Sequence, residues 1–187
     1  EYGDCFKYVM RRDDVVFKDA VATLGIRCGL PPYWINGADH EEYRAVIAKL
    51  LTSRAVFEQL SEAAAYMHKT LPSRIREQLR KQWGIVDETV DKLLIGYGDE
   101  TLIDHFVDDL DYDLDDECLR TGLFIPRRHH PDEKIRPIDF FQHRIVFPYW
   151  VGGSVKYMIG RRTEFTADNE YEKAKYKKLQ VHGERHK

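Results

Sequence analysis

The sequence has little cysteine and no long apolar run, and each absence excludes a class of protein. Its 187 residues include three cysteines, which are far apart and form no CxxC pair. A disulfide scaffold is therefore excluded, and a reducing cytoplasm is the expected compartment. No apolar run approaches the length of a membrane span, and no secretory signal opens the sequence, so no membrane partner is expected.

The sequence also lacks the patterns that bind phosphate or calcium through a short loop. Neither GxGxxG nor GxxxxGK[ST] occurs. The acidic residues between Asp108 and Glu117 alternate with hydrophobic ones and include no glycine, whereas a calcium loop needs a glycine inside a DxDxDG pattern. We interpret this stretch as a solvated helix face or an acidic loop, and we expect no metal ligand in the chain.

Charge is distributed unevenly, although the formal net charge is only −3. Residues 99–119 hold ten Asp and Glu and neither Lys nor Arg. Residues 120–187 hold 15 Lys and Arg against 8 Asp and Glu, a net of +7, while the first 98 residues balance at 14 of each sign. A basic C-terminal third is typical of a protein that binds a polyanion.

The first two thirds of the chain have the spacing of amphipathic helices. Apolar residues recur at helical intervals over residues 6–10, 16–26, 43–51 and 56–67. The last two ranges predict two successive helices, and Asp39 is the expected cap of the first of them.

Three further helices are marked by their end residues. A basic helix is expected between Pro72 and Gly84, because proline fits a first helical turn and glycine a helix end. Asp87 is the expected cap of a short helix that closes at Gly96, and Asp99 the expected cap of the next one.

The pattern changes to strands after Gly122. Residues 123–125 predict a short strand, and residues 143–150 and 154–161 predict two more, separated by the Gly152-Gly153 pair. Two glycines between β-rich runs indicate a hairpin, because its tight turn needs positive φ. Helices followed by strands predict an α+β fold, with a helical N-terminal part and a small antiparallel sheet that contains the hairpin.

The basic hairpin and the segment after it are the best candidates for a binding site. Cations at staggered positions can neutralise successive phosphates, and an aromatic ring beside them can stack on an unpaired base. The alternative is a solvated sheet edge protected by Lys and Arg. The candidate nucleic-acid-binding or nucleotide-binding residues are Arg144, Arg161, Lys175 and Tyr176, followed by Lys156, Arg162 and Lys178.

Several segments resemble, in the same order, the DnaG-type DNA primases of bacteria. They are the N-terminal Gly3 to Met10 with Phe17 to Val21, Trp83 to Tyr97, Thr121 to Ile125, Asp139 to Pro148, the glycine hairpin with Val155 to Arg161, and Ala174-Lys175-Tyr176. The family's pattern has further arginines where this chain has Phe140 and Gln142, and a proline where it has Ala174. The chain therefore resembles a distant member of the family.

The resemblance implies a domain order and a function. Residues 1–38 would be the helical end of a zinc-binding domain with its linker, and residues 39–187 the basic N-terminal subdomain of the RNA polymerase core. The family synthesises RNA primers on single-stranded DNA during replication. The ligands of its Zn²⁺ and of its catalytic Mg²⁺ or Mn²⁺, the latter in the TOPRIM subdomain, would lie outside this chain. We therefore expect no catalytic residue here and no primer synthesis by the chain alone.

The resemblance also implies partners, which are a single-stranded DNA template and nucleoside triphosphates, with a replicative helicase as a further candidate. An alternative stays open, in which the chain is a non-catalytic DNA-binding or protein-interaction module derived from a primase. A parent reading frame that continues into the TOPRIM motifs would favour the primase.

Overall fold

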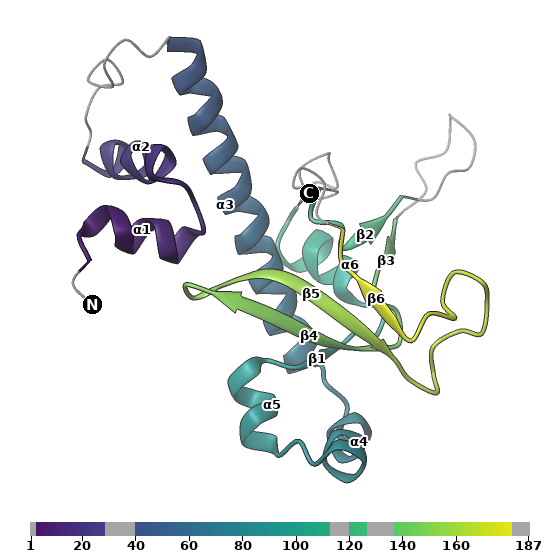
Figure 1. Cartoon of the computed structure of the whole chain (residues 1–187). Coiled ribbons are helices and arrows are strands. Elements are labelled where there is room, and N and C mark those ends of the chain that lie inside the picture. The colour runs from purple at the N-terminus through teal and green to yellow at the C-terminus, as the bar shows by residue number, and fades with distance from the viewer. Residues whose placement is uncertain (1–2, 29–39, 113–119, 127–136, 181–187) are drawn as a thin grey trace, which may run out of the picture. The chain divides into compact units, whose positions relative to one another are not determined.

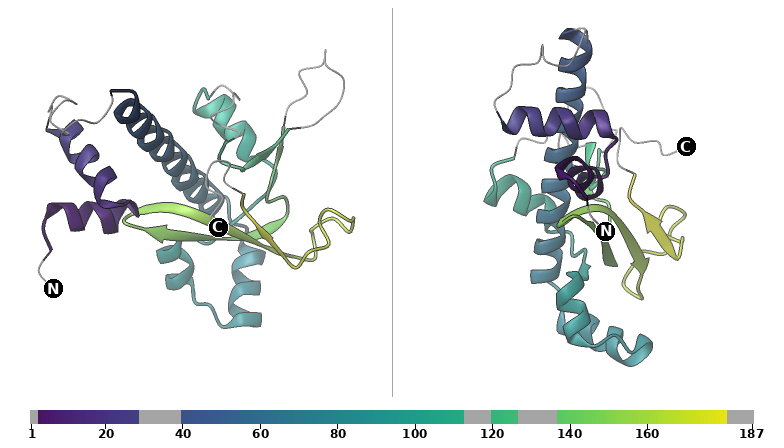
Figure 2. Two further views of the ribbon diagram at one scale, coloured as in Figure 1. Left: turned by 45° about the horizontal axis from the view of Figure 1, so that its top comes forward. Right: turned by 60° about the vertical axis from the view of Figure 1, so that its left-hand side comes forward.

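The structure, a computed structural model, describes residues 3–28, 40–112, 120–126 and 137–180. The chain divides into two compact units, residues 1–55 with 150–154 and residues 56–149 with 155–187. Figures 1 and 2 show the helices and strands of both units. The expected domain boundary between residues 38 and 39 lies outside the described residues and stays a prediction.

The first unit contains two short helices, α1 (Cys5–Asp13) and α2 (Phe17–Arg27), where the sequence predicts them. α1 begins after Asp4, whose carboxylate accepts a hydrogen bond from the Lys7 amide at 2.8 Å. This side-chain cap satisfies an amide that has no partner inside the helix. α1 ends at Asp14, which takes the left-handed conformation with a φ of 52°.

One long helix, α3 (His40–Lys69), replaces the two that the sequence predicts over residues 43–51 and 56–67. The prediction of two helices was wrong because residues 52–55 include neither glycine nor proline, so nothing ends the first helix. α3 begins in the first unit and ends in the second, where its apolar stripe is buried. The buried residues of this stripe are Val56, Leu60, Ala63, Ala64 and Met67.

The three shorter helices also form, and the first two of them are α4 (Ser73–Trp83) and α5 (Asp87–Leu93). α4 ends at Gly84, where a φ of 65° favours glycine. α5 begins with Asp87 itself and ends at Leu94, which takes a left-handed φ of 50°. The predicted closure at Gly96 was therefore wrong, and that glycine starts a strand instead.

The second unit is built around an antiparallel sheet whose strands lie in the order β1-β4-β5-β6. These strands are β1 (Gly96–Tyr97), β4 (Arg144–Val151), β5 (Ser154–Arg162) and β6 (Tyr176–Lys178). A separate antiparallel pair joins β2 (Phe124–Ile125) to β3 (Ile138–Asp139). The predicted α+β class and the glycine hairpin are confirmed. The sequence did not predict β1, β3 and β6, because two or three residues are too few to show an alternating pattern.

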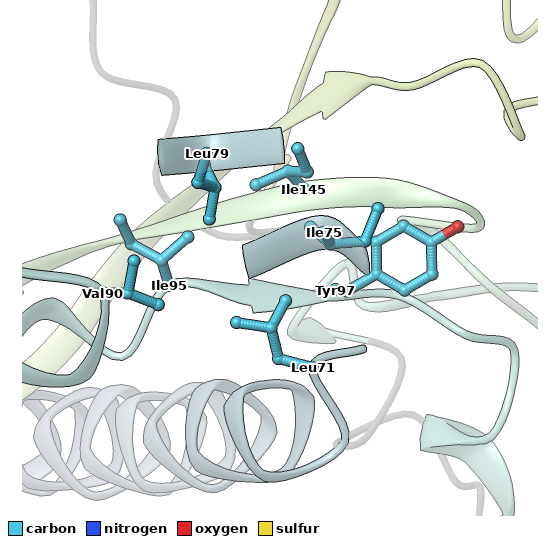
Figure 3. Close-up of a cluster of buried hydrophobic side chains, with 7 residues drawn as sticks. All are labelled: Leu71, Ile75, Leu79, Val90, Ile95, Tyr97 and Ile145. Carbon is cyan, nitrogen blue, oxygen red and sulfur yellow. The ribbon is translucent and has the colours of Figure 1, made fainter. Parts of the chain in front are cut away.

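Helices cover both faces of this sheet in the second unit. Successive strand residues point to opposite faces, and an added Cβ at Gly96 would lie 2.7 Å from the Cβ of Met67 on α3. The next residue, Tyr97, faces α4 and α5 instead and is 1% exposed. The core on that side, shown in Figure 3, comprises Leu71, Ile75, Leu79, Val90, Ile95, Tyr97 and Ile145.

Gly98, which directly follows β1, is hydrogen-bonded to residues more than 40 positions later in the chain. The Gly98 amide donates to the Arg144 carbonyl at 3.0 Å, and the His143 amide donates to the Gly98 carbonyl at 2.7 Å. An added Cβ at Gly98 would lie 2.1 Å from the carbonyl oxygen of Phe141, so only glycine fits at this crossing. The segment from 99 to 142 therefore starts and ends at one place on the sheet.

Asp139 of β3 caps a helix that lies far earlier in the sequence. That helix, α6 (Leu102–Asp104), continues into a π-helical turn over His105–Asp109. The two Asp139 carboxylate oxygens accept hydrogen bonds from the amides of Leu102 at 3.0 Å and Ile103 at 3.1 Å. Burial raises the pKa of Asp139 to about 6, although the two amide bonds act in the opposite direction.

The cap predicted from local spacing, Asp99, has a different role. Its Oδ1 accepts hydrogen bonds from the Thr101 amide at 3.3 Å and the Thr101 hydroxyl at 2.7 Å, which forms a turn before the helix. The prediction was wrong because the capping carboxylate comes from 37 residues further along the chain. No helix in the described ranges combines the length and apolar character needed to cross a bilayer.

Candidate nucleic-acid interface

Two of the predicted site residues meet on the edge of the sheet. β6 is the last strand of the sheet, and its residue Tyr176 lies opposite Arg161 of β5. Opposite residues in an antiparallel pair present their side chains on the same face. The Arg161 Nη1 donates a hydrogen bond to the Tyr176 hydroxyl at 2.7 Å.

A second ring and a second cation complete this group, which we call the Arg161 cluster: Trp83, Arg161, Lys175 and Tyr176. The Arg161 Cζ lies 4.1 Å from the centre of the Trp83 ring and 5.5 Å from that of Tyr176. The Lys175 Nζ lies 5.7 Å from the centre of the Tyr176 ring. The cluster therefore combines two cations with two aromatic rings, and Tyr176 and Lys175 are exposed. Trp83 is the member that the sequence did not suggest as a site residue.

Arg144, the first of the predicted contacts, is enclosed by the protein. Its side chain is 0% exposed. Its Nε donates to the Glu172 carboxylate at 3.0 Å, its Nη2 to the Glu172 carbonyl at 2.7 Å, and its Nη1 to the Ala174 carbonyl at 3.0 Å. Lys177 also binds Glu172, with 2.5 Å between Nζ and Oε1. We call Arg144, Glu172 and Lys177 the Arg144 clamp.

The three remaining predicted cations have different surroundings. Lys156 packs on α3, where its Nζ lies 3.4 Å from the centre of the Phe57 ring. The Arg162 Nη2 donates to Asp168 at 2.9 Å. Lys178 is exposed and stands two residues after Tyr176 on β6, hence on the same face. Lys156 and Arg161 are separated by an odd number of strand positions, so they lie on opposite faces of the sheet.

Helix α4, which contributes Trp83 to the Arg161 cluster, also carries arginines that contact neighbouring segments. The Arg74 guanidinium lies 4.0 Å from the centre of the Phe165 ring in the loop after β5. Arg76 is bound to Asp91 on α5 at 2.7 Å. An open hollow of about 210 Å³ separates α4 from this loop. It is lined by Arg74, Ile75, Glu77, Gln78, Lys81, Gln82, Glu164 and Phe165.

The described residues do not by themselves fit a catalytic metal or a structural zinc. Within the four described stretches, no group of three His, Cys, Asp or Glu side chains could hold a metal ion. Part of the acidic stretch, residues 113–119, lies outside these stretches.

Comparison with solved structures identifies the fold. No protein-family model and no curated protein matches the chain. The RNA polymerase domain of Mycobacterium tuberculosis primase DnaG, in complex with double-stranded DNA, matches with a TM-score of 0.55 and 20% identity over 68% of this chain. The chain has the fold of part of a DnaG-type primase RNA polymerase domain.

Two further primase structures agree with this assignment. The zinc-binding and RNA polymerase domains of the Aquifex aeolicus primase match with a TM-score of 0.54 and 20% identity over 95% of this chain. A DnaG primase catalytic domain bound to single-stranded DNA matches with a TM-score of 0.52 and 16% identity over 69% of this chain. The chain spans 39%, 39% and 38% of these three structures. The fold that the sequence resemblance implied is thus confirmed for part of the primase core.

Proposed function

We propose that this chain supplies the template-binding surface of a DNA primase, and that the Arg161 cluster contacts the phosphates and bases of single-stranded DNA or an incoming nucleoside triphosphate. The observation that carries the proposal is the cluster itself, with two cations and two rings at the edge of a sheet whose fold is that of a primase core.

The chemistry of the cluster supports a single-stranded ligand. A guanidinium and an ammonium neutralise phosphates and release counterions, which favours any polyanion. The partly exposed ring of Tyr176 can stack on an unpaired base, and a base inside a duplex offers no such face. Contacts of this kind fix the path of a strand rather than read its sequence.

The position of the other cations relative to the Arg161 cluster decides which of them can contact the same ligand. Lys178 shares the strand face of Tyr176 and is a second contact, and Arg162 borders the same edge. Lys156 is directed toward α3 and contributes at most from the other face. Arg144 has its donors engaged by the protein, so we assign it a positioning role rather than a phosphate contact.

In this proposal primer synthesis belongs to a larger cytoplasmic protein. Acidic side chains outside the described residues would hold Mg²⁺ or Mn²⁺, which would stabilise the negative charge that develops when the 3′-hydroxyl attacks the α-phosphate. The Arg161 cluster would hold the template or the triphosphate in place, with a replicative helicase as a further candidate partner.

The test is binding of a fluorescein-labelled oligothymidylate to the purified chain, followed by anisotropy at several salt concentrations. We expect Arg161→Ala and Lys175→Ala each to weaken binding about threefold to tenfold, or ~0.7–1.4 kcal/mol. Each should also reduce the salt dependence by about one counterion. Lys7→Ala, which removes an exposed cation from α1, serves as the control.

The outcomes separate the proposal from its alternative. If both cluster variants bind as tightly as the wild type while the salt dependence is unchanged, the site assignment is refuted. A chain that does not bind the oligonucleotide at all would instead favour the protein-interaction module derived from a primase.

A further inference from the structure

The clamp of Arg144, Glu172 and Lys177 holds the segment that carries half of the Arg161 cluster. After β5 the chain makes a loop and returns as the edge strand β6, which pairs with β5 at only three positions. Tyr176 is the first residue of this strand, and Lys175 directly precedes it. Tyr176 is paired with Arg161, and the Lys175 carbonyl accepts a hydrogen bond from the Arg162 amide at 2.9 Å. A three-residue edge strand contributes few such bonds, so the position of both residues also depends on what fixes the end of the loop.

Arg144 fixes that end through three acceptors on one short segment. The guanidinium binds both the side chain and the carbonyl of Glu172 and the carbonyl of Ala174, two residues further on. A planar guanidinium offers its donors in a rigid fork, so three acceptors held together define a unique geometry. The next residue along the chain is Lys175.

Glu172 is the centre of this arrangement. Its carboxylate binds Arg144 through Oε2 and Lys177 through Oε1, and the side chain is only 14% exposed. Lys177 points to the opposite face of β6 from Tyr176, and its Nζ lies 4.5 Å from the centre of the Phe140 ring. Glu172 thus neutralises one cation in the interior and one on the inner face of β6.

We propose that Glu172 is a positioning residue of the nucleic-acid surface, which keeps Lys175 and Tyr176 beside Arg161. This inference rests on the proposed function. It predicts a change in affinity for a polyanion that is opposite in sign to the change expected from charge alone. An acid near a basic surface should weaken the binding of a polyanion, so its removal should strengthen binding. If Glu172 acts by position, its removal weakens binding.

The experiment compares Glu172→Gln with Glu170→Gln in the same full chain. Both changes remove one negative charge from the same loop, but Glu170 is exposed. In Glu172→Gln the new amide turns an N–H toward a donor of either Arg144 or Lys177. We expect Glu172→Gln to bind oligothymidylate about fivefold more weakly, or ~1 kcal/mol, and Glu170→Gln to bind it as tightly as the wild type or up to about twofold more tightly.

Two further measurements distinguish positioning from a general loss of fold. Amide hydrogen exchange should rise in Glu172→Gln over residues 172–179 and stay unchanged over α4. Glu172→Asp keeps the charge but shortens the side chain by one methylene group, so it cannot reach Arg144 and Lys177 together. We expect Glu172→Asp to weaken binding as well, which no effect of net charge explains. If Glu172→Gln fails to fold, the binding of Glu172→Asp tests the inference in its place.

Each result supports or overturns the inference. Tighter binding by Glu172→Gln, equal to that of Glu170→Gln, would show that Glu172 acts only through its charge. Wild-type affinity in Glu172→Asp together with unchanged exchange in β6 would do the same. A wild-type chain that binds no oligonucleotide removes the proposed function itself, which is a different outcome from binding that is insensitive to Glu172.

Discussion

Arg144 and Arg161 are two arginines on neighbouring strands of one basic hairpin, yet their surroundings differ in every respect. Arg144 is buried and bound to a carboxylate and two backbone carbonyls. Arg161 lies against the rings of Trp83 and Tyr176 at the edge of the sheet. A count of charges in the hairpin gives both arginines the same weight, although only Arg161 lies at the edge of the sheet.

The difference shows what decides the role of an arginine. A buried guanidinium whose three nitrogens all donate inside the protein organises backbone, and it is not accessible to a phosphate. A guanidinium stacked on a ring stays available at its edges, because stacking uses its face. Strand position alone therefore does not identify a phosphate contact, and the partners of the side chain do.

The largest effect should follow loss of the buried arginine. Arg144→Ala leaves the Glu172 carboxylate in a mostly buried site with Lys177 as its remaining cation. We expect the free energy of unfolding to fall by about 3–5 kcal/mol, the usual cost of removing one partner of a buried ion pair. Arg161→Ala should cost less, about 1 kcal/mol, since it removes only an exposed hydrogen bond to Tyr176 and cation–π contacts with Trp83 and Tyr176. Urea denaturation of both variants measures this, and equal losses would contradict the contrast.

A somewhat smaller effect concerns Asp139, a buried acid that is held by amides rather than by a cation. Its pKa rises from 3.8 to about 6 on folding. The folded state therefore binds a proton more tightly than the unfolded state, and this contribution to stability is complete below pH 4 and is lost as the pH rises through 6. At about 1.36 kcal/mol per unit, the difference amounts to about 3 kcal/mol.

The variant Asp139→Asn tests this pH dependence. Its stability relative to the wild type should change by up to about 3 kcal/mol between pH 4 and pH 7, because the amide does not titrate. The wild type should gain stability over Asp139→Asn as the pH falls. Denaturation midpoints at four or five pH values would measure the trend, and parallel curves for the two proteins would contradict the assigned burial.

The smallest effect sharpens the contrast at Arg161 itself. Arg161→Lys keeps the positive charge but loses the planar group that stacks on Trp83. We expect about a threefold loss of affinity for oligothymidylate, or ~0.7 kcal/mol, with little change in salt dependence. Lys175→Arg, a conservative change in the other direction, should bind at least as tightly as the wild type. If Arg161→Lys binds like the wild type, charge alone accounts for this position.

Local patterns predicted the parts of the fold that are formed by neighbouring residues. Apolar spacing predicts α1 and α2, end residues predict α4 and α5, and two adjacent glycines predict the hairpin. The sequence predicts two helices in place of α3, but residues 52–55 contain no glycine or proline that would end the first one. Strands β1 and β6 were missed because each owes its existence to a partner elsewhere in the chain.

The site shows the same division between local and distant causes. The order of motifs and the basic hairpin indicated where cations gather, and Arg161, Lys175 and Tyr176 do meet. Burial of Arg144 could not be predicted, since its acceptors lie 28 and 30 residues further along. Trp83 and Glu172 carried no local signal for the same reason.

The pairing of Gly98 with His143 and Arg144 has a consequence for how this sequence can vary. All ten acids of the stretch between residues 99 and 119 fall between these paired positions. A segment whose ends meet at one point can change in length at a small entropic cost. The register of the sheet and the composition of the acidic segment can therefore diverge independently, so related chains could keep the hairpin while exchanging that segment for one of different charge.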